Sequence, residues 1–159
     1  MSVELPRGFT AHVTNIGIKD SSDDFTLVAA DSTCSAAGVF TQSRFAGPSV
    51  VVSREHLRGG RARGVVVISK NANVATGATG MTNAREVVAG VASALNCQAN
   101  EVLIASTGVI GRQYPMDAVR AVWPERLPLT MRLGTDDFHE DGVQFDEAVW
   151  AVAQLKEHG

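Results

Sequence analysis

The stretch that decides the fold is Val-Val-Val-Ile at residues 65–68, followed along the chain by Val-Leu-Ile-Ala at residues 102–105. Continuous apolar, β-branched runs of this length are typical of strands that are buried on both faces. Between the two runs, apolar residues recur at three- and four-residue spacing over residues 81–95. This spacing predicts a helix, with Thr82 as a possible N-cap. The order strand, helix, strand indicates a βαβ unit.

Downstream of this unit, Pro115 predicts the first residue of a short helix that runs to about Trp123 and ends before Pro124. The βαβ block with this helix therefore spans residues 62–123. Residues 124–141 have no regular pattern, and residues 145–155 place their apolar side chains on one face of a predicted helix.

Upstream, residues 9–41 have a pattern typical of β-structure. Residues 25–30 alternate and follow a turn-prone segment, and residues 35–40 form another short apolar run, which predicts neighbouring antiparallel strands. Residues 48–52, Pro-Ser-Val-Val-Val, predict a further strand with its proline in the first position, where no ladder donor is lost. Residues 53–57 predict one helical turn.

These elements predict an α/β fold with a mixed sheet and covering helices. The chain has 159 residues, which suits one compact domain, so we expect residues 1–159 to form a single α/β domain. A three-layer, Rossmann-like domain is the alternative, and the missing glycine fingerprint disfavours it.

Composition excludes several classes of partner. The formal net charge is −3, charged residues make up 19% of the chain, and lysine and arginine form no runs, so we expect neither nucleic acid nor a membrane as a partner. The apolar runs are too short to span a bilayer, and residues 1–7 do not resemble a secretory leader, which predicts a cytoplasmic protein. Cys34 and Cys97 have no second cysteine or histidine at ligand spacing, and we expect both to be buried thiols.

Two segments are weak candidates for ligand sites. Gly-Ala-Thr-Gly at residues 77–80 precedes a helix, but it has neither dinucleotide nor phosphate-loop spacing, so a tight turn is the better interpretation. The acidic residues 137–142 resemble a calcium loop, but the twelfth position is Ala148 instead of the glutamate that such a loop requires. The four histidines are scattered, and the residues predict no catalytic triad, no metal site and no cofactor.

A stronger candidate is Ser-Thr-Gly-Val-Ile-Gly at residues 106–111. It follows the second predicted strand of the βαβ unit, and α/β folds bind ligands at the carboxyl ends of such strands. The glycines let the backbone approach a substrate closely, and Thr107 offers a hydroxyl donor. A plain turn is the alternative.

Several motifs resemble the ornithine acetyltransferase family, whose members are also called glutamate N-acetyltransferases. The motif Asn-Ala-Asn-x-x-Thr-Gly occurs at residues 71–77, and the segment Leu-Ile-Ala-Ser-Thr-Gly-Val-Ile-Gly follows at residues 103–111. Other blocks between residues 6 and 116 follow the family in the same order. Residues 44–48 and 111–115 are most similar to the homologues found in clavulanic acid gene clusters.

The resemblance implies the activity. In the family, a precursor cleaves itself before an internal threonine into an α chain and a β chain, which assemble into a heterotetramer. The new N-terminal threonine takes the acetyl group of N-acetylornithine and passes it to glutamate in a ping-pong exchange. Carried onto this sequence, Thr107 and Gly108 form the oxyanion hole. The resemblance thus implies an α-chain-like polypeptide, a β-chain-like partner and no cofactor.

The sequence also departs from the family. Lys70 stands where better-known members have glycine, and residues 124–159 are divergent. The Thr-Thr-Asp-Thr segment and the Met-Ala-Thr cleavage junction of the family do not occur, so the nucleophilic threonine is absent from these 159 residues. The chain is either an α-chain-like fragment or a naturally shortened relative. Three functions remain: part of the acetyltransferase, a non-catalytic module that binds a ligand or partner chain, or half of a related N-terminal-nucleophile amidase. We expect the lone chain to be inactive and to self-associate or to bind a second polypeptide.

Overall fold

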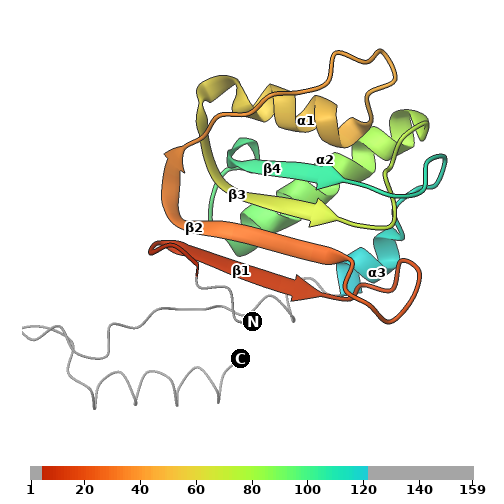
Figure 1. The fold of residues 1–159 in the computed structure, drawn as a ribbon, viewed down its shortest axis with the longest axis horizontal. Helices are drawn as coiled ribbons and strands as arrows, with labels where there is room; N and C mark the ends of the chain where they lie inside the picture. Colours follow the sequence, from red (N-terminus) through yellow and green to blue (C-terminus); the bar gives the residue numbers. More distant parts are fainter. Residues whose placement is uncertain (1–4, 122–159) are drawn as a thin grey trace, which may run out of the picture. The chain divides into compact units, whose positions relative to one another are not determined.

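Residues 5–121 are the part of the chain that this computed structural model describes, and they form one sheet with helices (Figure 1). The elements are β1 (Phe9–Thr14), β2 (Phe25–Ser35), α1 (Pro48–His56), β3 (Arg61–Ile68), α2 (Gly77–Ala94), β4 (Val102–Ser106) and α3 (Met116–Ala121), with short 3-10 turns at Leu57–Gly59 and Ala99–Glu101. All of them belong to one compact unit, Met1–Pro128. The predicted helix at residues 145–155, the acidic segment 137–142 and the end of the helix predicted to reach Trp123 lie outside the described residues. The single domain over residues 1–159 therefore stays a prediction.

The sheet is mixed, as predicted, and its strand order is β1-β2-β3-β4. The pairs β1–β2 and β2–β3 are antiparallel, and β3–β4 is parallel, so β3, α2 and β4 form the predicted βαβ unit. The run at residues 65–68 lies on β3, which is paired on both edges. The α/β fold with a mixed sheet and covering helices is confirmed.

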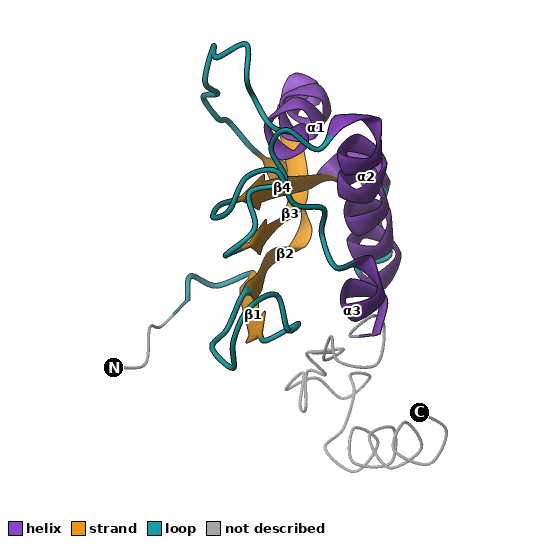
Figure 2. Cartoon of the chain, turned by 90° about the vertical axis from the view of Figure 1, so that its right-hand side faces the viewer, coloured by secondary structure: helices purple, strands orange, loops and turns teal. Residues whose placement is uncertain are grey.

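The helices create the core on one face of this sheet. Val66 and Ile68 of β3 are fully buried, together with Val88 and Val91 of α2. Figure 2 shows α2 and α3 lying against the same face of the sheet. Alternation along the strands sends every second side chain to this face, so the core is built from one side.

The opposite face of the sheet is mainly apolar, with Arg63 among its residues, and lacks a covering helix among residues 5–121. One row of register partners runs across all four strands: Ala11, Val28, Val65 and Leu103. Val65 is only half-buried, and Val13 on β1 is 50% exposed. We call this surface the open face. Within the described residues, β3 is therefore buried on one face only, and the prediction of burial on both faces is wrong.

The strand predicted at residues 48–52 is wrong, because these residues form the first half of α1. Pro48 suits the first position of a helix as well as that of a strand. Tertiary contacts outweigh the β-propensity of the valine run: Val52 is fully buried, and Ser53 donates to the carbonyl of Ile104 at 2.6 Å.

Two other boundaries differ from the prediction. β2 continues through residues 31–35 with an irregular register between Ala29 and Cys34, and residues 36–40 form no strand. α2 begins at Gly77, so Thr82 is not its N-cap and donates to Ala78 inside the helix at 3.2 Å. Residues 77–80 are thus the first turn of α2 and not a separate tight turn.

Two smaller points complete the fold. Both cysteines are free and half-buried instead of buried, and burial raises the pKa of the Cys97 thiol. In the described residues, each helix is too short or too polar to cross a membrane.

Candidate active site

Two loops meet where the parallel strands β3 and β4 end. The first is residues 69–76, and the second is residues 107–113, which we call the donor loop. Thr107 N–H donates to Ile68 O at 3.0 Å, and Val109 N–H donates to Lys70 O at 3.1 Å. Further along, Gly111 N–H donates to Val74 O at 2.7 Å. These bonds extend the contact between the two chain segments beyond the sheet, with one antiparallel and one parallel bridge, and hold the donor loop against its neighbour.

The first loop has an unusual backbone. Lys70, Asn73 and Ala75 have φ angles of 68°, 49° and 58°, a region that side-chain-bearing residues rarely adopt. Each such residue costs about 1–3 kcal/mol unless its surroundings hold it, and such residues gather at functional sites. The backbone strain of this loop therefore lowers stability, and the surrounding contacts keep the loop in one conformation.

Buried amide side chains hold that shape. Asn73, with no exposed surface, donates from Nδ2 to Gly80 O at 2.9 Å, and its backbone N–H donates to Asn71 Oδ1 at 2.8 Å. Asn71 Nδ2 in turn donates to Gln113 O at 2.9 Å, which ties in the donor loop. Thr76 donates to Asn73 Oδ1 at 2.8 Å. The Asn-Ala-Asn-x-x-Thr-Gly motif thus builds the frame under the donor loop.

The structure shows the role of Lys70, which stands where better-known members of the family have glycine. Its backbone has a glycine-like conformation, while its Nζ lies 2.6 Å from Asp20 Oδ1 and 3.8 Å from Asp24 Oδ2. The hydrogen bond from Lys70 holds the pKa of Asp20 well below its usual range. Lys70 therefore links the β1–β2 loop to the first loop, a role that the sequence did not predict.

The predicted site residues, Thr107 and Gly108, lie side by side at the start of the donor loop, and both are exposed. Thr107 has committed its N–H to Ile68, so only its hydroxyl is available as a donor. Neither that hydroxyl nor the Gly108 N–H has a hydrogen-bond partner among residues 5–121. Gly108 has φ 129°, and a Cβ there would lie 2.5 Å from the Cα of Lys70, so this position requires glycine.

The histidines do not complete a triad in the described residues. His56 Nδ1 lies 2.8 Å from Val102 O, and His12 Nε2 is buried and has no hydrogen-bond partner among residues 5–121. Neither is hydrogen-bonded to a serine or threonine hydroxyl. Thr107 and Gly108 can stabilise a developing negative charge by hydrogen bonding, but no described group is placed to activate a nucleophile.

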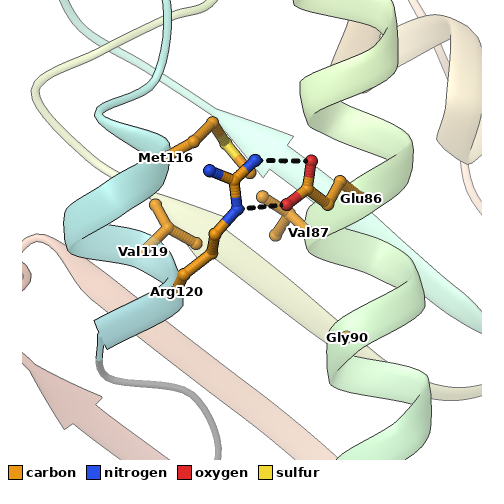
Figure 3. Close-up of a pocket in the computed structure, with 6 residues that line it drawn as sticks. All are labelled: Glu86, Val87, Gly90, Met116, Val119 and Arg120. Atoms are coloured by element: carbon orange, nitrogen blue, oxygen red, sulfur yellow. Dashed lines mark hydrogen bonds and ion pairs between the residues drawn. The ribbon is translucent and has the colours of Figure 1, made fainter.

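A separate small hollow lies between α2 and α3 (Figure 3). Its volume is about 90 Å³, and its lining is mainly Val87, Met116 and Val119. Arg120 closes it with a two-pronged ion pair to Glu86, with Nε–Oε1 at 2.6 Å and a second bond at 3.1 Å. The hollow is too small for an amino-acid substrate, and its ion pair is a link between two helices.

We expect Arg120→Ala to lower the free energy of unfolding only slightly, because an exposed ion pair is screened by water and salt. Urea denaturation of the two proteins measures the difference, which should shrink in high salt. Arg112→Ala is the matched control, since Arg112 is exposed and has no ion-pair partner among residues 5–121. A loss much larger than that in Arg112→Ala, and unchanged by high salt, would show that the ion pair has a larger role.

Comparison with known proteins places these features in a family. Residues 10–150 match the ArgJ family. The chain is 57% identical to glutamate N-acetyltransferase Oat2 of Streptomyces clavuligerus over 118 residues, which cover 74% of this chain and 30% of that protein. It is 52% identical to arginine biosynthesis bifunctional protein ArgJ 2 of Nostoc sp. over 73% of this chain and 30% of that protein. The chain therefore spans about a third of the length of these relatives.

Two solved structures have the same fold. Ornithine acetyltransferase from Mycobacterium tuberculosis, complexed with ornithine, is similar with a TM-score of 0.70 and 36% identity, over 73% of this chain and 64% of that chain. The bifunctional protein ArgJ of Bacillus halodurans is similar with a TM-score of 0.70 and 28% identity, over 72% of this chain and 61% of that chain. The match over residues 10–150 shows that this chain, with its donor loop and its Asn-Ala-Asn frame, belongs to the ArgJ family.

Proposed function

We propose that this chain is the α-chain-like part of an acetyltransferase that moves an acetyl group from N-acetylornithine to glutamate. The observation that carries the proposal is the pair of adjacent, unpartnered donors at the end of β4, the Thr107 hydroxyl and the Gly108 N–H. Membership of the ArgJ family and the similarity to a glutamate N-acetyltransferase and to an ornithine-bound structure support this choice of substrates.

The proposed reaction has two halves. The hydroxyl of an N-terminal threonine, supplied by a segment outside these 159 residues, attacks the acetyl carbonyl of N-acetylornithine. Its proton passes through the threonine's own amine to the ornithine nitrogen as the C–N bond breaks, which leaves an acetyl ester on the threonine. The amine of glutamate then attacks this ester, and the proton that it loses returns to the threonine oxygen.

Each half passes through a tetrahedral oxyanion, and this is the species that Thr107 and Gly108 would bind. Two preorganised donors aimed at one oxygen stabilise the charge without the cost of reorienting water. Because the Thr107 N–H already donates to Ile68 O, the two donors of this oxyanion hole are a side-chain hydroxyl and a backbone N–H.

The open face supports the proposal of a partner chain. Val65 and Leu103 are half-buried, Val13 is 50% exposed, and together they present an apolar sheet surface to solvent. Surfaces of this kind favour association. We propose that a β-chain-like polypeptide covers the open face and brings the nucleophile to the donor loop, with a second copy of this chain as the alternative occupant. The face at residues 145–155 that we also expect near this contact lies outside the described residues.

The test combines sizing with turnover. The chain is prepared alone and together with the polypeptide that supplies the remaining length of the relatives, and labelled acetyl transfer from N-acetylornithine to glutamate is measured. We expect transfer only in the combined sample, and light scattering should show association. A lone chain that is a clean monomer at high micromolar concentration, with a cooperative melt and no binding of an apolar dye, would contradict the need for a partner.

The same assay separates the alternatives. An amidase half would release free acetate with or without glutamate, whereas a transferase requires the acceptor. A non-catalytic module would show no turnover at any ratio of the two chains but would still bind N-acetylornithine or ornithine in calorimetry. Turnover by the lone chain would contradict the proposal that the nucleophile lies outside these residues.

A further inference from the structure

Three hydroxyl groups join the two ends of the donor loop to helix α1. Ser106 immediately precedes the loop, Tyr114 immediately follows it, and Ser49 lies on α1. Each pair among the three is in hydrogen-bonding contact: Ser49 with Ser106, Ser106 with Tyr114, and Ser49 with Tyr114 at 3.1 Å. We call this arrangement the hydroxyl ring.

The three hydroxyls of the ring can satisfy one another's hydrogen-bonding capacity. A hydroxyl has one donor, so three hydroxyls in a cycle can each donate once and accept once. Ser49 and Tyr114 are only 4% and 3% exposed, which removes water as a competing partner. Burial raises the pKa of Tyr114, against smaller lowering effects of the Ser106, Ser49 and Asn73 side chains, so its hydroxyl keeps its proton at neutral pH. Cyclic, buried hydrogen bonds of this kind reinforce one another.

The position of the ring matters more than its strength. At the start of the donor loop, Thr107 is held to the sheet by its bond to Ile68 O. At the end of the loop, Tyr114 is brought back to Ser106 by a direct contact between their hydroxyls. In addition to its bonds to the first loop, the loop that carries the Thr107 hydroxyl and the Gly108 N–H is therefore joined end to end by the contact between the Ser106 and Tyr114 hydroxyls.

A second serine on α1 provides a natural comparison. Ser53 lies one turn after Ser49, donates to Ile104 O at 2.6 Å and accepts from Ile104 N–H at 2.7 Å. It links the same helix to the same strand, but in the middle of β4 and without contact to the donor loop. Substitution of Ser53 thus tests the attachment of α1 to β4 alone, whereas substitution of Ser49 also tests closure of the donor loop.

We propose that the hydroxyl ring of Ser49, Ser106 and Tyr114 is a clamp that fixes the two oxyanion donors of the donor loop, with Tyr114 as the positioning residue. The proposal rests on the function proposed above. Oxyanion stabilisation depends on donors that are already aimed at the reacting oxygen, and misplacement by about 1 Å can cost about 100-fold in rate. Tyr114 acts on the reaction through the loop and does not touch the substrate.

The first variant is Tyr114→Phe, which keeps the aromatic ring in its buried site and removes only the hydroxyl. In the combined, active protein we expect kcat to fall about 10-fold, with KM for N-acetylornithine within about twofold, because the ground state is bound as before. In the 159-residue chain, we expect the amides of Val109 and Gly111 to exchange with deuterium about 10-fold faster, while β3 and β4 amides keep their rates. Ser49→Ala should change both measurements in the same direction.

The control variant is Ser53→Ala. We expect it to lower the melting temperature, since Ile104 N–H loses its acceptor, and to leave kcat and donor-loop exchange unchanged. Donor-loop exchange in Tyr114→Phe that matches the wild type, or an unchanged kcat, overturns the proposal. A combined sample of wild-type protein that transfers no acetyl group contradicts the proposed function instead, and the exchange rates then decide the clamp by themselves.

Discussion

Thr107→Ala is expected to lower turnover of the combined protein about 100- to 1000-fold, which corresponds to roughly 3–4 kcal/mol of lost transition-state stabilisation. The substitution is narrow. The Thr107 backbone N–H keeps its bond to Ile68 O, so the loop stays in register, and only the side-chain hydroxyl is removed. Because that hydroxyl has no partner among residues 5–121, the substitution removes no hydrogen bond within the described part of the chain. Steady-state kinetics with N-acetylornithine and glutamate measure kcat, and a thermal melt confirms that stability hardly changes.

Thr107→Ser is the matched control, since it keeps a hydroxyl on Cβ and removes one methyl group. We expect it to restore turnover to within about 10-fold of the parent, because the donor remains while its rotamer is less restricted. If Thr107→Ala instead turns over within about twofold of the parent, the hydroxyl is not an oxyanion donor, and the assignment of Thr107 fails.

The centre of the fold follows from local sequence. β3, α2 and β4 were predictable because the helical spacing of apolar residues lies between two apolar runs, an order that indicates a βαβ unit. The position of the donor loop follows as well, because it comes after a buried strand of a parallel pair. The roles proposed for Thr107 and Gly108, by contrast, follow from the family resemblance and not from spacing.

The elements that could not be predicted depend on contacts between distant residues. In α1, the valines at residues 50–52 favour a strand locally, but Ser49 and Ser53 bond to β4 more than 50 residues away, and those bonds require a helix. The hydroxyl ring joins residues 49, 106 and 114, which share no sequence pattern. The left-handed backbone at Lys70 could not be predicted from its residue type, because lysine rarely adopts a positive φ angle.

Asp24 is another residue whose importance the sequence conceals. It stands at the end of a turn-prone segment, where an aspartate is ordinary. In the structure it is 2% exposed, and its carboxylate accepts hydrogen bonds from Ile16 N–H at 2.7 Å and Ile18 N–H at 2.9 Å. Its own backbone carbonyl accepts from Ser69 N–H at 2.8 Å, at the start of the first loop of the candidate site. Asp24 thereby joins the β1–β2 loop to that site.

We expect Asp24→Ala to lower the free energy of unfolding by roughly 2–5 kcal/mol, since two backbone N–H groups lose their acceptor and each unpaired buried donor costs about 1–3 kcal/mol. Asp24→Asn keeps one acceptor oxygen and should lose about half as much, which supplies a measurement even where the alanine variant does not fold. Asp23→Ala is the control, because Asp23 is the exposed neighbour and should change stability by less than about 0.5 kcal/mol. Urea unfolding of the three variants, followed by far-ultraviolet circular dichroism, gives the differences. A loss in Asp24→Ala no larger than in Asp23→Ala would mean that water replaces the carboxylate, and that the Asp24 side chain does not hold the β1–β2 loop in shape.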